Sequence, residues 1–458
     1  MVNEHDTIAA VATGGVISAI GILRISGPEA VSVMDRVFRP ADGRPMSAHA
    51  DRELVYGALL DRQGETLDLC LGTVSRSPHS YTGEDTAELQ CHGSPVVLAA
   101  GLESLFARGA RQALAGEFTR RAFLNGRLDL TRAEAVIDII EARTPLAAKN
   151  AAGQLFGAVQ RSADAVYAAL RDISSHYHAV LDYPDEDIEP FELENYKSTV
   201  SAAERSLRRL LGTYERGRYL DRGVPAVIAG KPNAGKSSLL NALLGYERAI
   251  VTELPGTTRD TLYEGCVVGG VPLRLTDTAG MRLTKDRVEA LGVERARSAA
   301  EEAELLLAVF DLSRPWEPED EDVAALAKAA PKSIAVANKC DLPAVWESGR
   351  LSAHFDAVCV LSAREGAGLD GLEKAVADLF PLPEAPAGEI LTNARQAEAI
   401  GRAAEHLHAA AAALAEGWTA DAVLTECEGA MGALAELTGR EVRADVTDAI
   451  FSRFCVGK

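Results

Sequence analysis

A glycine-rich segment in the middle of the chain restricts the possible fold more than any other feature. Residues 230–237, GKPNAGKS, match the pattern G-x-x-x-x-G-K-[ST]. They follow the apolar run VPAVIA and precede SSLLNALLG, which is the strand–loop–helix context that the pattern requires. Backbone N–H groups of such a loop and the helix N-terminus hold phosphate oxygens. We therefore predict an α/β nucleotide-binding domain in which Lys236 reaches the β- and γ-phosphates and Ser237 binds Mg²⁺.

Three further segments each follow an apolar run, and they occur along the chain in the order that the motifs of guanine-nucleotide-binding proteins have. Residues 277–280, DTAG, end the run VPLRLT, where a carboxylate can hold Mg²⁺ through water. Residues 338–341, NKCD, resemble the base-recognition motif of the GTPase superfamily, and residues 362–363 resemble its fifth motif. An aspartate accepts two hydrogen bonds that guanine supplies and adenine does not, so GTP is predicted. The residues predicted to bind GTP are Asn233, Ala234, Gly235, Lys236, Ser237, Ser238, Thr252, Thr257, Thr258, Asp277, Thr278, Ala279, Gly280, Asn338, Lys339, Asp341, Ser362 and Ala363.

The segment between the P-loop and DTAG is expected to order around GTP. It contains TELPGTTRD at residues 252–260, in which one of two adjacent threonines can complete the Mg²⁺ shell. The residue after DTAG is Met281, where Ras-type enzymes place a glutamine that orients water. Because methionine cannot orient water, hydrolysis requires another carboxylate, amide or ion. Candidate carboxylates downstream are Asp286, Glu289 and Glu294.

Changes in composition and in apolar periodicity along the sequence predict where one domain ends and the next begins. Short apolar runs broken by Gly, Pro and Asp predict an N-terminal α+β domain at residues 1–122. Ala-rich segments with helical periodicity precede and follow a block of alternating strands and helices. We therefore predict a discontinuous helical bundle at 123–218 and 386–458, broken by Pro near residue 184, and an inserted Ras-like, doubly wound, mostly parallel P-loop domain at 219–385.

Composition excludes several functional classes. No run of 18 or more apolar residues appears, so no membrane span is expected. The seven cysteines are scattered and never spaced as Cys-x-x-Cys, which argues against disulfides and zinc and for a reducing, cytoplasmic location. A net charge of −20 disfavours nucleic-acid binding by the whole surface. The local basic cluster of Arg120, Arg121, Arg127 and Arg132 is open to a role in folate binding or in packing.

The segments GKPNAGKSSLLNALLG, PGTTRD, DTAGMR, NKCD and the terminal FCVGK together resemble the MnmE (TrmE) family of bacterial tRNA-modification GTPases, within the TrmE-Era-EngA-like superfamily. GILRISG, YTGEDTAELQCHG and GEFTRRAFLNGRLDLTRAEA, nearer the N-terminus, resemble that family's folate-binding domain. The resemblance covers nearly the whole chain. It departs at the terminal motif, which is usually F-C-I-G-K.

The resemblance implies a homodimer that works with the FAD-containing protein MnmG (GidA) in a heterotetramer. Together they would add an aminomethyl or carboxymethylaminomethyl group to C5 of the wobble uridine of certain tRNAs. A 5-formyl- or 5,10-methylene-tetrahydrofolate, bound by the N-terminal dimerisation domain, would supply the one-carbon unit, and GTP hydrolysis would be required. Because the chain is acidic, we expect the partner to hold most of the tRNA.

The resemblance also implies a replacement for the missing glutamine. The family's GTPase domains dimerise across their nucleotide faces and trap K⁺ where an arginine finger would place its charge. Thr258 then joins Ser237 as a Mg²⁺ ligand, and Glu289 aligns with a catalytic glutamate that orients water indirectly. The matching K⁺ ligands are Asn233, Thr252, Thr257 and, through its backbone carbonyl, Leu254.

The positions that match the family's folate-binding residues are Arg24, Glu88, Arg127 and Lys458. Some family members have lysine where this chain has Arg127, so the contact geometry differs there. We interpret Cys455 as a terminal thiol without a nucleophilic role. Cys91-His92 has no partners at metal-ligand spacing and is interpreted as structural.

Two alternatives belong to other functional classes. A GTP-regulated ribosome-assembly or RNA-binding factor of the Era or Der type usually carries a basic KH-like domain, whereas the flanks here are Ala-rich and acidic. A membrane-remodelling GTPase of dynamin type requires an amphipathic or apolar insertion segment, and the sequence shows none.

Overall fold

A computed structural model of the chain describes residues 6–14, 16–182, 193–246, 263–276, 297–383, 385–441, 444–452 and 454–457. The chain divides into two compact units. The first comprises residues 1–137, 163–168 and 431–458, and the second comprises residues 138–162 and 169–430.

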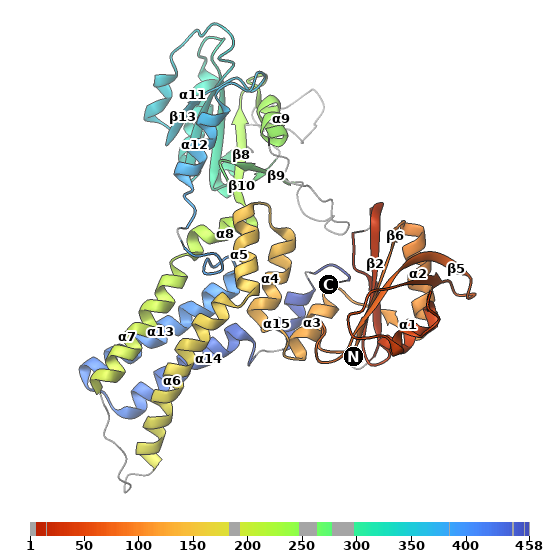
Figure 1. Ribbon diagram of the computed structural model, residues 1–458. Coiled ribbons are helices and arrows are strands. Elements are labelled where there is room, and N and C mark those ends of the chain that lie inside the picture. The colour runs from red at the N-terminus through yellow and green to blue at the C-terminus, as the bar shows by residue number, and fades with distance from the viewer. Residues whose placement is uncertain are drawn as a thin grey trace. The chain divides into compact units, whose positions relative to one another are not determined.

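A seven-stranded sheet forms the main part of the first unit, in the order β3-β4-β5-β6-β2-β1-β7. Neighbouring strands are antiparallel except β1 and β7. Helices α1 and α2 cover one face (Figure 1), where Leu23, Ile25 and Leu89 pack against Val33 and Leu105. The elements are β1 Ile8–Val11, β2 Ser18–Ser26, α1 Ala30–Val37, β3 Phe38–Pro40, a 3₁₀ helix Met46–Ala48, β4 Val55–Leu60, β5 Thr66–Ser75, β6 Thr86–Gly93, α2 Pro95–Ala107 and β7 Arg111–Gln112.

The C-terminal segment returns to this unit. Helix α15 (Ala444–Phe451) packs on α3 (Glu117–Leu124), where the rings of Phe123 and Phe451 lie 6.2 Å apart. Beyond α15, Val456 forms an isolated antiparallel bridge with Ala115. Phe454 packs on Phe451 of α15, and Gly457 accepts a hydrogen bond from Arg24 of β2, so the last described residues join α15 to the N-terminal sheet.

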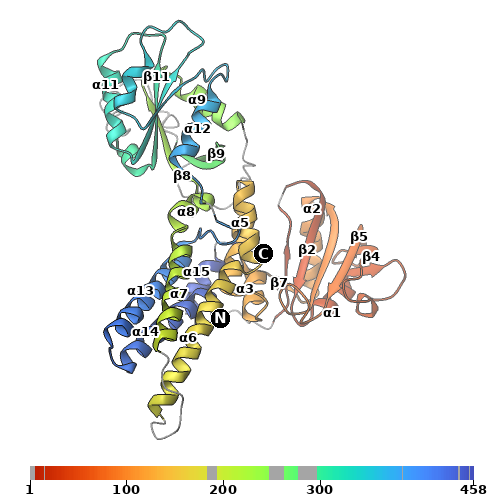
Figure 2. The ribbon, with the colours of Figure 1, turned by 60° about the vertical axis from the view of Figure 1, so that its left-hand side comes forward.

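The long helices predicted after residue 129 are present, and α7 and α13 lie side by side (Figures 1 and 2). Helix α13 begins where Asn393 accepts a hydrogen bond from the Arg395 N–H, and it ends at Gly417 in a left-handed conformation. The helix break predicted near residue 184 lies outside the described residues. The helices are α4 Leu130–Glu141, α5 Pro145–Leu155, α6 Ala158–Asp182, α7 Leu193–Leu211, α8 Tyr214–Arg222, α13 Ala394–Glu416 and α14 Ala420–Thr438.

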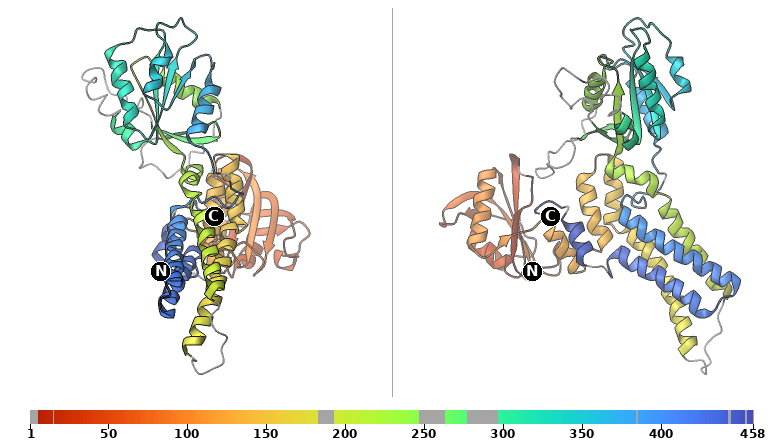
Figure 3. Two further views of the ribbon diagram at one scale, coloured as in Figure 1. Left: turned by 90° about the vertical axis from the view of Figure 1, so that its left-hand side faces the viewer. Right: turned by 180° about the vertical axis from the view of Figure 1, so that it is seen from behind.

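The second unit also contains a six-stranded sheet in the order β13-β12-β11-β8-β10-β9. All strands are parallel except the edge strand β9. Helices α9 and α12 cover one face of this sheet, and α11 covers the other (Figure 3). Because side chains alternate along a strand, Ile228 belongs to the core under α9 and α12, whereas Val227 and Ala229 belong to the core under α11. The elements are β8 Val224–Gly230, α9 Lys236–Tyr246, β9 Tyr263–Val268, β10 Val271–Thr276, β11 Leu305–Asp311, α11 Pro318–Ala325, β12 Lys332–Asn338, β13 Ala357–Val360, α12 Leu369–Leu379 and 3₁₀ helices Leu326–Lys328 and Ser348–Ala353.

The edge strand β9 was not predicted, although the sequence carried a signal for it. Gly269 and Gly270 form a two-residue turn, with φ of +58° and +79°, between Val268 and Val271. A Gly-Gly pair flanked by apolar residues is a typical hairpin connection, because both turn residues need positive φ. None of the described helices is long and apolar enough to cross a lipid bilayer.

Candidate nucleotide-binding site

The glycine-rich loop lies at the carboxyl edge of the parallel sheet, between β8 and α9. Strand β8 is buried on both faces, which fixes the point where the loop begins. Gly235 has φ of +103°, and a Cβ atom there would lie 2.1 Å from Nδ2 of Asn338. Only glycine fits this position, because the loop backbone approaches the Asn338 side chain so closely.

Lys236 curls back under the loop. Its Nζ donates hydrogen bonds to the carbonyl oxygens of Gly230 (2.7 Å) and Lys231 (2.8 Å). Burial lowers the pKa of Lys236 from its ordinary value. Ser237 and Ser238 are exposed in the first turn of α9. A cation, two hydroxyls and a helix N-terminus therefore meet at one loop, which is the chemistry that polyphosphate requires.

Asn338 joins three segments that the sequence analysis assigned separately to the site. It ends β12 and is 2% exposed. Its Nδ2 donates to the Ala234 carbonyl (2.9 Å), and its Oδ1 accepts from the Ala363 N–H (3.0 Å). Ser362 is fully buried, and its hydroxyl oxygen accepts from the Glu365 N–H. The structure therefore brings the P-loop, NKCD and the 362–363 segment together.

Lys339 links the same loop to a residue that the sequence analysis did not single out. Its Nζ donates to the Asn233 carbonyl (2.9 Å) and to Oδ2 of Asp311 (2.6 Å). Lys339 and Asn233 both have positive φ, +66° and +63°, which is uncommon for non-glycine residues. Backbone strain of this kind gathers at ligand-binding sites. Asp341, predicted to bind the base, is exposed.

Several predicted site residues lie outside the described part of the chain, and their positions stay predictions. They include the threonines of the switch segment, the DTAG motif and the water-orienting glutamate. These residues are Thr252, Leu254, Thr257, Thr258, Asp277, Thr278, Ala279, Gly280, Glu289 and Lys458.

Two residues of the predicted folate site form an ion pair on the N-terminal sheet. Arg24 on β2 lies opposite Glu88 on β6, and Arg24 Nε donates to Glu88 Oε1 at 2.7 Å. The side chains are 19% and 29% exposed, so the pair is reachable from solvent. Arg24 Nη1 also donates to the Gly457 carbonyl at 3.4 Å, which draws the end of the chain to this pair.

Aromatic rings enclose the Arg24 guanidinium. Its central carbon lies 5.7 Å from the ring centroids of both Tyr81 and Phe118. The Tyr81 hydroxyl is hydrogen-bonded to Thr119 Oγ1 (2.9 Å). Arg127 is exposed and lies near Gly83, where a Cβ atom would be 3.1 Å from Arg127 Cγ. Tyr81, which the sequence analysis did not single out, lies in the YTGEDTAELQCHG segment.

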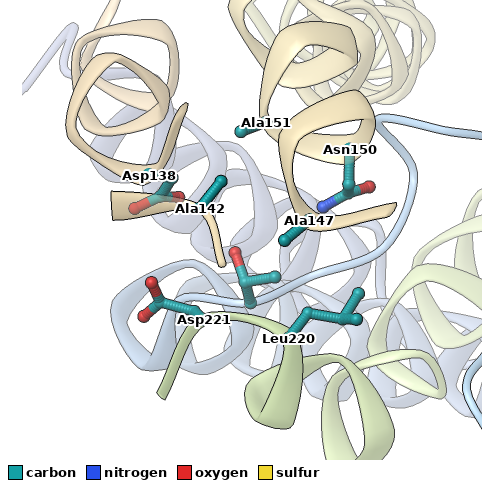
Figure 4. A pocket seen from close by; sticks show the side chains of 8 residues that line it. Asp138, Ala142, Ala147, Asn150, Ala151, Leu220 and Asp221 are labelled. Carbon is teal, nitrogen blue, oxygen red and sulfur yellow. The ribbon is translucent and has the colours of Figure 1, made fainter. Parts of the chain in front are cut away.

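Other features of the described residues carry no predicted chemistry. No group of three or more His, Cys, Asp or Glu is arranged to hold a metal within the described ranges. Cys91 is buried, and His92 Nδ1 is hydrogen-bonded to Asp68 at 2.8 Å. A small hollow between helices contains none of the predicted site residues (Figure 4). It is lined by Asp138, Ala142, Ala147, Asn150, Ala151, Leu220, Asp221 and Thr392.

The chain is similar to known proteins along its whole length. A family model described as the GTP-binding protein TrmE N-terminus matches residues 7–127, and the MnmE helical domain matches residues 130–455. The tRNA modification GTPase MnmE of Symbiobacterium thermophilum is 43% identical over 99% of this chain and 100% of that protein. The MnmE proteins of Chloroflexus aurantiacus (44% identical, 99% and 100% covered) and Thermus thermophilus (42% identical, 100% of both covered) are comparably similar.

Among solved structures, Aquifex aeolicus Era bound to GDP and AlF4⁻ is 27% identical, with a TM-score of 0.27 over 40% of this chain and 66% of that chain. The assignment of a family rests on the sequence matches instead. Two domain models that match residues 7–127 and 130–455, and relatives above 40% identical over nearly the full length, show that the chain belongs to the MnmE (TrmE) family of tRNA modification GTPases.

Proposed function

We propose that this protein is a K⁺-activated GTP hydrolase that acts in tRNA modification. With an FAD-dependent MnmG partner, it adds an aminomethyl or carboxymethylaminomethyl group to C5 of the wobble uridine. The observation that carries the proposal is the junction at Asn338, which holds the phosphate loop and the base-recognition segment together. A ribosome-assembly factor of Era type is disfavoured, because both flanks match MnmE-family domains.

The described residues suit the proposed roles at the nucleotide. Lys236 and the loop amides bind phosphate, Asp341 binds the guanine edge, and Ser237 holds Mg²⁺ together with Thr258, which lies outside the described residues. Asn233 has its backbone carbonyl held by Lys339 and its side chain exposed, and an amide oxygen is a hard donor that suits K⁺. We propose that Thr252, Thr257 and the Leu254 carbonyl complete that site and that Glu289 orients water. K⁺ supplies positive charge that stabilises charge developing on the phosphates.

The proposal assigns a separate role to each of the three domains predicted from the sequence. Residues 1–122 bind a one-carbon tetrahydrofolate and form the homodimer, 123–218 with 386–458 form the helical domain, and 219–385 hydrolyse GTP. Arg24, Glu88, Arg127 and Lys458 hold the folate, which supplies the one-carbon unit. The partly exposed Arg24–Glu88 pair beside Tyr81 fits a ligand with a charged tail and an aromatic ring, because it offers both charges next to a ring face.

The decisive experiment measures GTP turnover in K⁺ and in Na⁺ at matched ionic strength. We expect K⁺ to raise kcat by about tenfold or more, because the ion replaces an arginine finger. Asn233→Ala is expected to lose this stimulation. Asn241→Ala changes an exposed asparagine of α9 and serves as the matched control that keeps it.

The outcomes separate the parts of the proposal. Equal turnover in both salts would leave GTP hydrolysis standing and remove the K⁺ mechanism. Unchanged K⁺ stimulation in Glu289→Ala would remove that residue from catalysis. Failure of the purified chain with MnmG and folate to modify wobble uridine would remove the modification reaction.

A further inference from the structure

Asp311 lies outside every motif assigned above, yet the sheet places it at the nucleotide site. It is the last residue of β11 and is paired in register with Asn338 on the neighbouring strand β12. Because the two strands are parallel, their carboxyl ends meet at one edge, and Lys339 follows directly after β12. The Asp311 side chain is 10% exposed.

Hydrogen bonds engage both oxygens of the Asp311 carboxylate. Oδ1 accepts from the Ser313 N–H (2.9 Å) and the Ser313 hydroxyl (2.6 Å), and Oδ2 accepts from Lys339 Nζ (2.6 Å). Burial acts to raise the pKa of Asp311, but the bonds from Lys339 and Ser313 outweigh it and hold the pKa below its ordinary value. The Trp346 indole N–H donates to the Asp311 carbonyl at 3.1 Å, which fixes the backbone as well.

The Lys339 ammonium lies between Asp311 and the phosphate loop. It donates one hydrogen bond to the Asp311 carboxylate and another to the Asn233 carbonyl at 2.9 Å. A lysine side chain has a flexible four-carbon stem, so the position of its ammonium group is set by the groups that bind it. The orientation of Lys339, and with it the Asn233 peptide, therefore depends on a carboxylate that is 28 residues away in sequence.

We infer that Asp311 is a positioning residue for guanine-nucleotide binding, acting through Lys339 on the phosphate loop. The inference rests on the nucleotide site proposed above and adds to it a residue that contacts no nucleotide itself. It predicts that Asp311 governs how tightly the nucleotide binds.

A second ion pair on the same loop serves as a matched control. Lys231 Nζ is paired with Asp320 on α11 at 3.1 Å, and the Asp320 carboxylate is 12% exposed. Asp320 also accepts the Glu317 N–H in a capping box. This aspartate–lysine pair has similar burial and does not involve Lys339, although Lys231 also donates to the Glu317 carboxylate.

The experiment is a double-mutant cycle on the full chain, measured as the Kd of a fluorescent GDP analogue and the kinetics of GTP turnover. Asp311→Asn is expected to raise Kd for GDP and KM for GTP by about tenfold. In the Lys339→Met background, Asp311→Asn should add nothing, because its effect passes through Lys339. Asp320→Asn should change Kd by less than about threefold and should add fully to Lys339→Met.

Additive effects of Asp311→Asn and Lys339→Met would overturn the inference, as would a loss of kcat without a change in KM. If Asp311→Asn does not fold, Ser313→Ala tests the same point, because it removes one hydroxyl that holds the carboxylate. It should raise Kd by about twofold to threefold in the wild-type background and not at all with Lys339→Met. Absence of guanine-nucleotide binding by the wild-type chain would instead remove the proposed function.

Discussion

At the scale of single residues, Arg121 belongs to a cluster of basic residues in the sequence, yet its side chain is buried and paired with carboxylates. Its side chain is 4% exposed, and it donates hydrogen bonds to Asp6, Glu84 and Glu117. The sequence left this cluster open to folate binding or packing. For Arg121 the structure shows packing, because its guanidinium is enclosed by three carboxylates rather than presented to solvent.

Glu117 makes this network dependent on pH. Burial acts to raise its pKa, but hydrogen bonds from Arg111, the Leu114 N–H and Arg121 lower it below the ordinary value of 4.5. The ionised Glu117 carboxylate therefore stabilises the folded state fully above pH 4.5. This stabilisation is lost as the pH falls through the lower pKa that Glu117 has in the folded state. We expect Glu117→Gln to cost about 2–3 kcal/mol at pH 7, and the difference from wild type to shrink below about pH 4.

Urea unfolding at several pH values measures this prediction. Glu29→Gln, whose carboxylate is 63% exposed, is the control and should change stability by less than about 0.5 kcal/mol. A constant difference between Glu117→Gln and wild type from pH 7 to pH 3 would contradict the argument.

At the scale of elements, buried polar groups hold the chain where it re-enters the helices. Asn150 Oδ1 accepts from the Gly388 N–H (2.8 Å), and Asn150 Nδ2 and Gln154 Nε2 both donate to the Ile390 carbonyl. The Thr213 hydroxyl oxygen accepts from the Leu391 N–H (2.9 Å). These bonds satisfy backbone groups of an irregular segment that contains a turn at Pro386–Glu389, and buried backbone groups usually require such partners.

Helix α8 packs so closely on this segment that Gly217 cannot gain a side chain. A Cβ atom there would lie 2.2 Å from the Leu391 carbonyl oxygen. Gly217→Ala should therefore destabilise the chain by about 1–3 kcal/mol, although alanine favours helix. Gly432→Ala in α14, where a Cβ atom meets nothing within 4 Å, should stabilise it by about 0.5–1 kcal/mol. Urea unfolding, followed by the circular dichroism signal of the helices, gives the free energy of unfolding of both variants. Changes of the same sign in the two variants would contradict the packing argument.

At the scale of the whole molecule, charge limits how the chain meets tRNA. With 67 acidic and 47 basic residues, the chain repels a polyanion over most of its surface. We expect the chain alone to bind tRNA with a Kd above about 1 μM at physiological salt, and the proposed MnmG partner to tighten binding. Fluorescence anisotropy with labelled tRNA measures this, with a tRNA that lacks a wobble uridine as control. Nanomolar binding by the chain alone would refute it.

The segments of the candidate nucleotide site could be identified because their sequence signals are local. The phosphate loop needs eight consecutive residues between a strand and a helix, and NKCD and residues 362–363 each follow an apolar strand. The order of these segments determines that they meet, since the carboxyl ends of parallel strands share one edge. The long helices were equally predictable, because apolar periodicity is a property of each segment alone.

Only the tertiary structure decided which distant groups meet. Asp311 and Lys339, Arg24 and Gly457, and Gly217 and Leu391 come together through strand register and helix packing, and no short pattern in the sequence marks them. An aspartate after an apolar run is compatible both with a solvated turn and with a buried anion. Its role depends on the neighbour that folding supplies, because burial without that cation would leave the carboxylate uncompensated.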